Sequence, residues 1–252
     1  MSNSSNRRRV DLGENDSGYS IYAVGDIHGC IDLLRHAEDL IRKDVERSEI
    51  AGLIVLLGDY CDRGADSYGV IEHLLTAPGG GLKRLTLCGN HDDLFLRFLE
   101  CPRRNWHWLE LGGRETLASY GISPVHLDAR RDIGHSGFEN NLLAELRERV
   151  PVRHVEFLRN MPVCARIGRY FFAHAGIRPG VSVENQTDED LMWIREPFIS
   201  RGPDLPIQVI HGHTCFKSPS FGPNRIGIDT GAYLTGKLSI LKLFGAKSNF
   251  LS

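Results

Sequence analysis

The sequence predicts an α/β protein in which a parallel sheet with helical crossovers faces a second sheet. The first half of the chain repeats one unit three times: an apolar strand, a polar loop flanked by glycine, and a helix. A βαβαβ run of this kind implies parallel strands with right-handed crossovers. The second half holds short apolar runs separated by turn residues, which predict a second, mostly antiparallel sheet.

The three strands of the first half are short apolar runs, at residues 20–24, 53–57 and 82–87. The middle one, Leu-Ile-Val-Leu-Leu, is short and β-branched enough to be a buried strand. Apolar residues at helical spacing follow each strand, at residues 31–46, from residue 67 to the stop at Pro78, and after Asp92. Because open α/β sheets bind ligands at the carboxyl ends of their strands, the three polar loops should meet there.

Residues 101–160 interrupt this alternation and contain Trp106, Trp108 and the glycine pair 112–113. We interpret the segment as a helical insertion packed beside the sheet, with the two tryptophans in its core. Its expected helices lie near residues 140–149 and 152–160. Strands resume after it, at residues 163–167, 170–173, 207–210, 225–228 and 237–243.

One domain accounts for the chain. Its 252 residues, 41% hydrophobic and 25% charged, have the composition of an ordinary globular protein. We expect a single domain at residues 19–245, preceded by a polar flexible tail at 1–18 and followed by a short tail at 246–252. The arginines at 7–9 are interpreted as solvated, and because no apolar core follows them they are not expected to form a signal peptide.

Charge and cysteine usage exclude several classes of partner. The net charge of −2 provides no electrostatic basis for binding nucleic acid. No run of the sequence is apolar for long enough to span a membrane. The six cysteines have neither CxxC pairing nor regular spacing, which indicates a reducing compartment and predicts a cytoplasmic protein.

Metal-binding side chains gather at the predicted strand ends: Asp26, His28, Asp59, Asn90, His174 and one histidine of the pair His211 and His213. Asp26 and His28 lie two apart in an extended segment, so both can point at one ion. A bridging Asp59 could hold two cations about 3.5–4 Å apart, and Asn90 would add an oxygen ligand without charge. Oxygen and imidazole ligands together suit Mn, Fe or Zn better than Ca or Mg.

Four further side chains offer proton transfer and phosphate binding. His91 can donate a proton to a leaving alkoxide if a carboxylate fixes its tautomer, and Asp62 is the candidate carboxylate. Arg63 and Arg195 offer planar forks suited to phosphoryl oxygens. A surface salt bridge is the alternative interpretation of Arg195, and His211 is expected to have a structural or supporting role.

Each of these residues also has an ordinary structural explanation. Asp26 and His28 could belong to a capped turn, Asn90 could cap a helix, and His174 could be a hydrogen-bonded core residue. The structural explanation requires five independent coincidences at strand ends, so the functional interpretation is favoured. Asp229 is interpreted as structural.

Three motifs carry a family resemblance: Gly-Asp-Ile-His-Gly at 25–29, Gly-Asp-Tyr-Cys-Asp-Arg-Gly at 58–64 and Gly-Asn-His-Asp at 89–92. In this order and spacing they resemble the phosphoprotein phosphatase family of calcineurin-like metallophosphoesterases. His174-Ala-Gly and Gly-His213-Thr resemble its two later metal-binding motifs, so the resemblance runs from about Tyr22 to Leu243. It implies the calcineurin-like fold, in which two facing mixed sheets form a β-sandwich flanked by helices.

The resemblance implies a role for each matching residue. One metal ion would be bound by Asp26, His28 and Asp59, and the other by Asp59, Asn90, His174 and His213. The general acid would be His91, oriented by Asp62, and the phosphate clamps would be Arg63 and Arg195. Members of the family hydrolyse phosphoesters by direct attack of metal-bound hydroxide, without a phosphoenzyme. The implied cofactors are two divalent metal ions, with Mn²⁺ as the first expectation and Fe or Zn as alternatives.

Two departures from the family pattern concern the substrate. Asp92 stands where eukaryotic protein phosphatases usually have Glu, whereas bacterial members and symmetrical dinucleoside tetraphosphate hydrolases often have Asp. The dinucleotide hydrolases also resemble this chain at residues 228–231. They lack, however, an acid at the position of Asp62 and the Trp-Ile-Arg segment that contains Arg195.

The resemblance therefore favours the bacterial serine/threonine protein phosphatases, which act on phosphoproteins or phosphopeptides. One alternative is a symmetrical dinucleoside tetraphosphatase, or another phosphoanhydride hydrolase of the same fold, with a dinucleoside polyphosphate as substrate. A rival from another class is an inactive phospho-binding module that keeps the fold.

Overall fold

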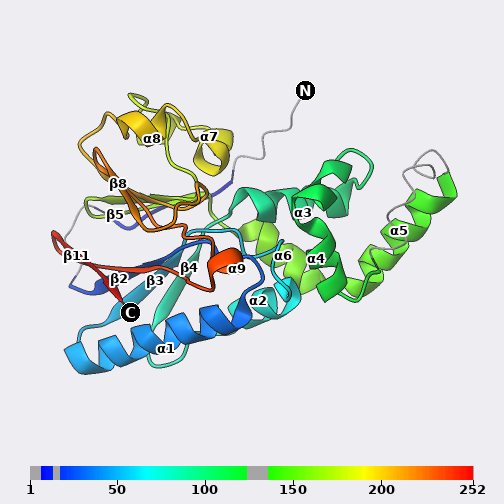
Figure 1. Ribbon diagram of the computed structural model, residues 1–252, viewed down its shortest axis with the longest axis horizontal. Helices are drawn as coiled ribbons and strands as arrows, with labels where there is room; N and C mark the ends of the chain where they lie inside the picture. The colour runs from blue at the N-terminus through cyan, green and yellow to red at the C-terminus, as the bar shows by residue number, and fades with distance from the viewer. Residues whose placement is uncertain (1–6, 14–17, 124–135, 252) are drawn as a thin grey trace.

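The protein is a two-sheet sandwich with helices on its outer faces (Figure 1). The computed structural model describes residues 7–13, 18–123 and 136–251. One sheet has the strand order β11-β10-β2-β3-β4 and the other β1-β5-β6-β7-β9-β8. The predicted α/β fold with two facing mixed sheets is therefore confirmed.

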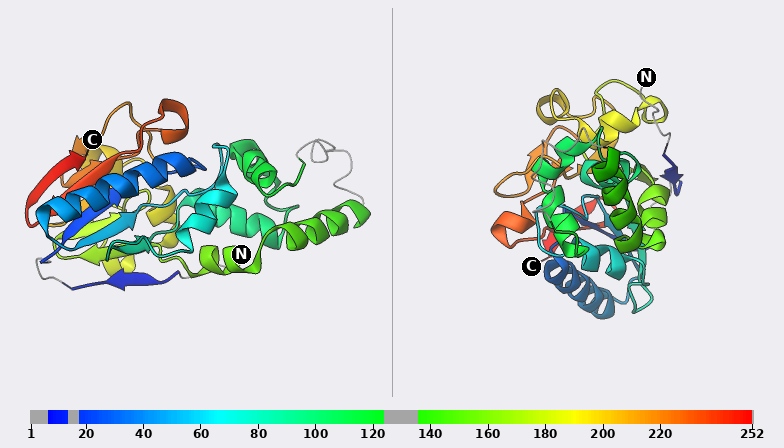
Figure 2. Two further views of the ribbon diagram at one scale, coloured as in Figure 1. Left: turned by 90° about the horizontal axis from the view of Figure 1, so that it is seen from below. Right: turned by 90° about the vertical axis from the view of Figure 1, so that its right-hand side faces the viewer.

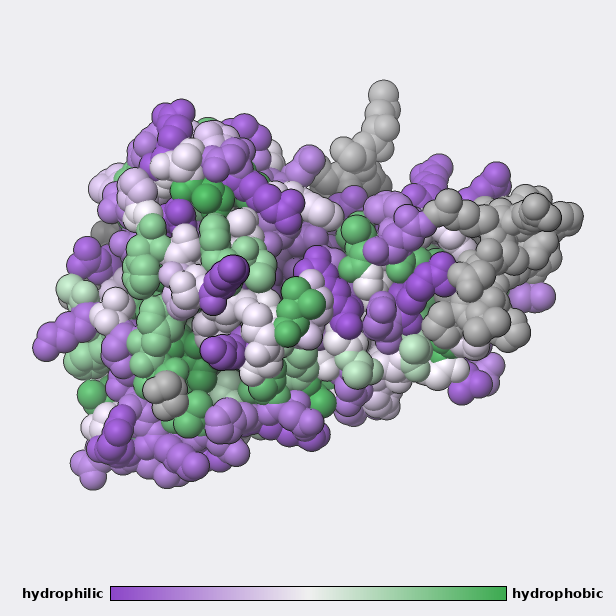
Figure 3. Space-filling model, viewed as in Figure 1, coloured by the Kyte–Doolittle hydropathy of each residue, from purple (hydrophilic) through white to green (hydrophobic). Residues whose placement is uncertain are grey.

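The first sheet is built around the three expected parallel strands, β2 (Ser20–Val24), β3 (Gly52–Leu56) and β4 (Lys83–Thr86). The expected helices follow them as α1 (Ile31–Ser48), α2 (Ser67–Leu74) and α3 (Asn90–Glu100). Successive residues of β2 face opposite sides of the sheet, so Tyr22 and Val24 pack on the helices whereas Ile21 and Ala23 pack between the sheets. Figure 3 shows that the outward surface of α1 is hydrophilic, as expected of an amphipathic helix.

Two strands at the end of the chain correct the prediction. The strand expected at 237–243 is β10 (Ile240–Phe244), and it pairs antiparallel with β2 in the first sheet, not in the second. The expected tail at 246–252 contains β11 (Lys247–Leu251), which forms a hairpin with β10. The edge of β2 opposite β3 has backbone groups that need partners, and β10 provides them. β11 then pairs with the outer edge of β10.

The second sheet consists of β1 (Arg9–Asp11), β5 (Cys164–Ile167), β6 (Tyr170–Ala173), β7 (Gln208–His211), β9 (Arg225–Gly227) and β8 (Ser220–Gly222). The expectation of a mostly antiparallel sheet is wrong, because β1 with β5, β6 with β7, and β7 with β9 are all parallel pairs. The long connection between β6 and β7 holds α7 (Asp188–Trp193) and α8 (Phe198–Arg201), and this length allows a parallel crossover.

Part of the expected N-terminal tail is ordered. Residues 1–6 and 14–17 lie outside the described residues, but Arg9–Asp11 form β1. Arg7, expected to be solvated, is buried, and its Nη2 lies 2.9 Å from Oδ1 of Asp93 on α3. Arg9 pairs with Asp188 at 2.9 Å. These acidic partners neutralise the arginines against the body of the protein, which the polar composition of the tail did not reveal.

The insertion packs beside the first sheet through η1 (Trp106–Leu111), α4 (Gly113–Ser119), α5 (Ser136–Arg149) and α6 (Val152–Asn160), and residues 124–135 lie outside the described part. Trp108 is fully buried and stacks on Phe95 of α3 at a ring distance of 5.1 Å. Figure 2 shows α5 extending away from the two sheets. Among the described helices, none combines the length and apolarity needed to cross a bilayer.

Candidate active site

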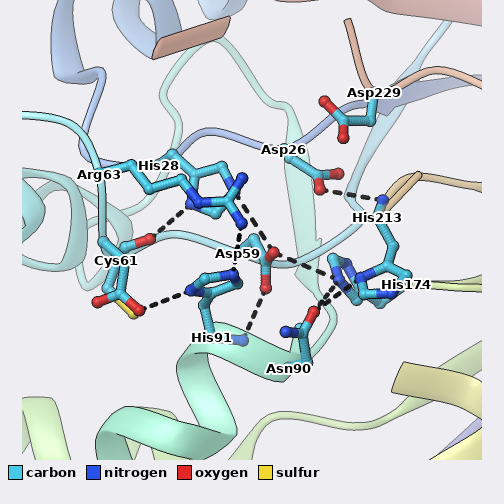
Figure 4. A network of polar contacts seen from close by, with 12 residues as sticks. Asp26, His28, Asp59, Cys61, Arg63, Asn90, His91, His174, His213 and Asp229 are labelled. Carbon is cyan, nitrogen blue, oxygen red and sulfur yellow. Dashed lines mark hydrogen bonds and ion pairs between the residues drawn. The ribbon is translucent and has the colours of Figure 1, made fainter. Parts of the chain in front are cut away.

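Asp59 lies at the centre of a cluster formed by the loops that follow the strands (Figure 4). Its Oδ2 atom is 3.5 Å from Nε2 of His28 and 3.4 Å from Nε2 of His174. All three side chains are buried. One carboxylate oxygen therefore faces two imidazole nitrogens, which is the arrangement that a carboxylate bridging two cations requires.

Asn90 and His213 extend the cluster toward the second sheet. Asn90 Oδ1 is 2.8 Å from His174 Nε2 and 2.9 Å from His213 Nδ1. The backbone amide of His213 donates a hydrogen bond to Asp26 Oδ2 at 3.0 Å. The six residues predicted as metal ligands thus come together from five separate loops.

Asp26 lies outside the two tightest groups of donor atoms in the cluster. Among the described residues, the His, Cys, Asp and Glu donor atoms that lie within 4.8 Å of one another belong to two groups: His28, Asp59 and His91, and Asp59, His174 and His213. Asp26 belongs to neither group and contacts His213. The premise of an extended segment does not hold at His28, whose φ of 45° lies in the left-handed region.

The donor set fits divalent cations. Nδ1 of His28 contacts the carbonyl oxygen of Cys61 at 2.8 Å, and Nδ1 of His174 contacts that of Leu57 at 3.0 Å. A carbonyl accepts only, so each Nδ1 carries the proton and each Nε2 directs a lone pair at Asp59. Burial lowers the pKa of His28 to about 3 and also lowers that of His174, which keeps both rings neutral. Lone pairs that converge in this way need a cation between them.

Two buried atoms of the cluster support the same conclusion. Oδ1 of Asp26 and Nε2 of His213 have no hydrogen-bond partner within the part of the chain that the structure describes. Burial, and then the charges of Asp229 and Asp59, raise the pKa of Asp26 well above its usual value. A bound cation would satisfy these atoms and offset the crowded carboxylates.

His91 forms a buried pair with Asp62. Its Nδ1 is 2.7 Å from Asp62 Oδ2, and its Nε2 accepts a hydrogen bond from Arg63 Nη2 at 3.0 Å. Although burial opposes it, the charge of Asp59 and then the hydrogen bond of Asp62 raise the pKa of His91. The geometry is that of an imidazole held by a carboxylate, with its far nitrogen facing the cluster.

The insertion braces this pair through contacts that the sequence pattern did not predict. Trp108 Nε1 donates to Asp62 Oδ2 at 2.7 Å, and Thr116 Oγ1 donates to Asp62 Oδ1 at 2.6 Å. The amide of Arg63 donates to the Gly112 carbonyl at 3.2 Å, and a Cβ on Gly112 would lie 2.6 Å from that amide nitrogen. The glycine pair after Trp108 was the available signal, because it marks a close backbone approach.

Replacing Trp108 by phenylalanine is expected to lower kcat about 10-fold with little change in KM, since it removes one of the bonds that hold the carboxylate behind His91. The phenyl ring keeps the packing on Phe95. Steady-state kinetics on an aryl phosphate measures the effect, with Trp106→Phe as the control within the same insertion. Equal losses in both variants would show that Trp108 only packs.

Asp92 is a positioning residue, a role that its sequence position, informative only about the substrate class, did not indicate. Its fully buried carboxylate accepts backbone N–H bonds from Asp59, Gly89 and Tyr60 at 2.8, 2.9 and 2.9 Å. These bonds tie the start of α3 to the loop that carries Asp59. Asp59, Asp62 and Arg63 in that loop have left-handed φ values of 55°, 72° and 67°, which cost conformational free energy. The bonds to Asp92 help to hold the loop in this strained conformation.

The remaining predicted residues differ in their closeness to the cluster. The exposed side chain of Arg195 makes no hydrogen bond or ion pair with any described residue, but its charge contributes to lowering the pKa of His174 and His213. The ring of His211 packs edge-on against Phe198 at 5.0 Å, outside both donor groups, in keeping with a structural role. Asp229 is buried beside Asp26, closer to the cluster than its structural interpretation implied (Figure 4).

Comparison with known proteins identifies the family. A family model for calcineurin-like phosphoesterases matches residues 19–242. A symmetrical bis(5'-nucleosyl)-tetraphosphatase of Methylococcus capsulatus is 31% identical over 166 residues, or 66% of this chain, but the match covers only 46% of that relative. Serine/threonine-protein phosphatase 2 of Salmonella typhimurium is 28% identical over 88% of this chain and 92% of its own length.

A crystal structure provisionally named a diadenosine tetraphosphatase has the same fold, with a TM-score of 0.64 at 22% identity over 97% of each chain. The family model and the Salmonella relative confirm the resemblance to the phosphoprotein phosphatases. Calcineurin-like phosphoesterases use a dinuclear centre of divalent metal ions, for which the cluster around Asp59 offers the donor groups. The chain belongs to the calcineurin-like phosphoesterase family and is a metallophosphoesterase hydrolase.

Proposed function

We propose that this enzyme is a phosphomonoesterase that removes phosphate from phosphoserine and phosphothreonine in proteins. The observation that carries the proposal is the buried contact of 2.7 Å between His91 Nδ1 and Asp62 Oδ2. A serine or threonine alkoxide is a poor leaving group, and a positioned proton donor speeds its departure by about 10²–10⁴-fold. The phosphate released from an anhydride leaves readily without a proton, so a braced acid favours the ester.

In this proposal, different residues of the site bind the metal ions, bind the phosphoryl group and transfer the proton. Two divalent cations, held by Asp26, His28, Asp59, Asn90, His174 and His213, would lower the pKa of a shared water and offset charge on the phosphoryl oxygens. Arg63 and Arg195 bind the oxygens that do not react. Once a phosphoryl group has taken the Nη2 donor of Arg63 from His91, Nε2 would be free to hold a proton for the leaving oxygen, while Asp62 keeps the ring in place. Mixed nitrogen and oxygen donors favour Mn²⁺, with Fe or Zn as alternatives.

A direct comparison of substrates tests the proposal. With Mn²⁺ present, kcat/KM for a phosphoserine peptide is expected to exceed that for diadenosine tetraphosphate by at least about 10-fold, or about 1.4 kcal/mol. Asp62→Asn should reduce turnover of the peptide much more than turnover of the dinucleotide, since only the alkoxide needs the proton. A preference for the dinucleotide would overturn the proposal. If neither substrate were hydrolysed, the proposal would also fail, and the protein would be interpreted as an inactive phospho-binding module.

A second candidate is hydrolysis of dinucleoside tetraphosphates. The name of the Methylococcus relative favours it, and so do two aromatic rings at the site. Trp193 is 38% exposed, with its ring 6.1 Å from that of His213, and Tyr233 is partly exposed, with its ring 5.4 Å from that of His28. Bases stack on such rings. The preference for the dinucleotide in the same comparison would establish this function.

A further inference from the structure

Arg63 is held between the cluster and a residue from the far end of the chain. Its Nη1 donates to the hydroxyl of Tyr233 at 3.3 Å, and its guanidinium carbon lies 5.1 Å from the centre of the Tyr233 ring. Its Nη2 donates to His91 at 3.0 Å. The hydroxyl and the face of one tyrosine therefore both contact the cation that is proposed to bind phosphate.

The position of Tyr233 is set by a short, tightly held helix, α9 (Ala232–Thr235). Gly231, which precedes it, has a φ of 65° and donates its amide to Asp229 Oδ1 at 2.8 Å. A Cβ on Gly231 would lie 2.8 Å from Cys215 Sγ, so the helix sits directly against the loop that carries His213. The ring of Tyr233 also meets that of His28 edge-on at 5.4 Å. It is thus fixed relative to the metal-binding loops.

Packing does not account for this tyrosine. Tyr233 belongs to neither of the two apolar cores formed by the described residues, and its side chain is partly exposed. Its neighbour Leu234 is 71% exposed. The contacts that Tyr233 does make are with Arg63 and His28, two residues of the active site.

We propose that Tyr233 is a positioning residue for the phosphoryl group, which acts by holding the fork of Arg63 toward the cluster. A half-buried arginine has several rotatable bonds, and a fixed orientation has an entropic cost that the hydroxyl and the ring offset. A phosphoryl group that takes the Nη2 donor from His91 then meets a guanidinium that is still held by Tyr233. The inference rests on the proposed clamp role of Arg63, but not on the choice between protein and dinucleotide substrates.

Kinetics on an aryl phosphate, with inorganic phosphate as a competitive inhibitor, test this inference. Tyr233→Phe keeps the ring and loses the hydroxyl, so KM and the phosphate inhibition constant should both rise about 3-fold. Tyr233→Leu loses both contacts, and both constants should rise about 10- to 30-fold with kcat within about 3-fold of the wild type. Leu234→Ala, on the same short helix, is the control and should leave all three constants unchanged.

A double-mutant cycle separates positioning from a structural role. In an Arg63→Ala background, Tyr233→Leu should change the phosphate inhibition constant by less than about 2-fold, because the group through which it acts is gone. Additive effects in the two backgrounds, or an equal effect of Leu234→Ala, would overturn the inference. If Arg63→Ala left KM and the phosphate inhibition constant unchanged, both the clamp role of Arg63 and this inference would be overturned. The choice between protein and dinucleotide substrates would be unaffected, because the comparison of the two substrates tests it separately.

Discussion

The Asp59→Asn variant is expected to lose at least about 1,000-fold in kcat/KM on an aryl phosphate, equivalent to about 4 kcal/mol of transition-state stabilisation. Oδ2 of Asp59 faces His28 and His174 from a single point, so it belongs to both proposed cation sites. In the wild type, a chelator should abolish hydrolysis and Mn²⁺ should restore it. In the variant Mn²⁺ should not restore it, because the neutral amide is a poor bridging ligand.

Metal content measured after dialysis provides a readout that does not depend on turnover. The wild type should retain about two divalent ions per chain and the variant fewer than one. Asparagine tolerates the left-handed φ of 55° at this position, so the fold should persist, and a thermal melt checks this. Full activity of the chelated wild type, or an unchanged metal content in Asp59→Asn, would contradict the dinuclear site.

His91→Asn is expected to lower kcat by about 10²–10⁴-fold while KM stays within a few-fold of the wild type, because it removes a proton donor that acts in the transition state. The loss should be larger for a phosphoserine peptide than for a nitrophenyl phosphate, whose leaving group departs readily without a proton. Steady-state kinetics on the two substrates measures both effects.

The matched control is His36→Asn, at an exposed position of α1, which should leave both parameters unchanged. A variant of His91 that raised KM and spared kcat would place this histidine in substrate binding. Equal losses on both substrates would also remove it from the role of proton donor, because the effect would no longer follow the leaving group.

The sequence alone located most of the candidate site. Glycine-flanked polar loops after apolar runs predict strand ends, and parallel strands bring those ends to one edge of a sheet. Asp59, Asn90 and His91 do lie together at this edge, where the His91 amide donates to Asp59 Oδ1 at 3.0 Å. The reason is that strand formation and turn geometry depend on a few neighbouring residues, so their pattern is visible in the chain itself.

Side-chain direction was less predictable. The expectation that Asp26 and His28 point the same way assumed extended backbone, but His28 has a left-handed φ of 45°. That φ depends on contacts with the loop after β3, since the His28 amide donates to the Asp59 carbonyl at 2.8 Å. A strained backbone of this kind is stable only where the surrounding fold holds it.

What the sequence by itself determined was the βαβαβ order, the strand ends and the chemistry of the side chains at them. The tertiary structure alone decided the partners: β10 beside β2, Trp108 behind Asp62, and Tyr233 against Arg63. The last two pairs are separated by 46 and 170 residues. Strands and turns are determined by steric interactions between neighbouring residues, so a short stretch of sequence predicts them. Contacts between residues so far apart in the chain form only when complete helices and strands pack together.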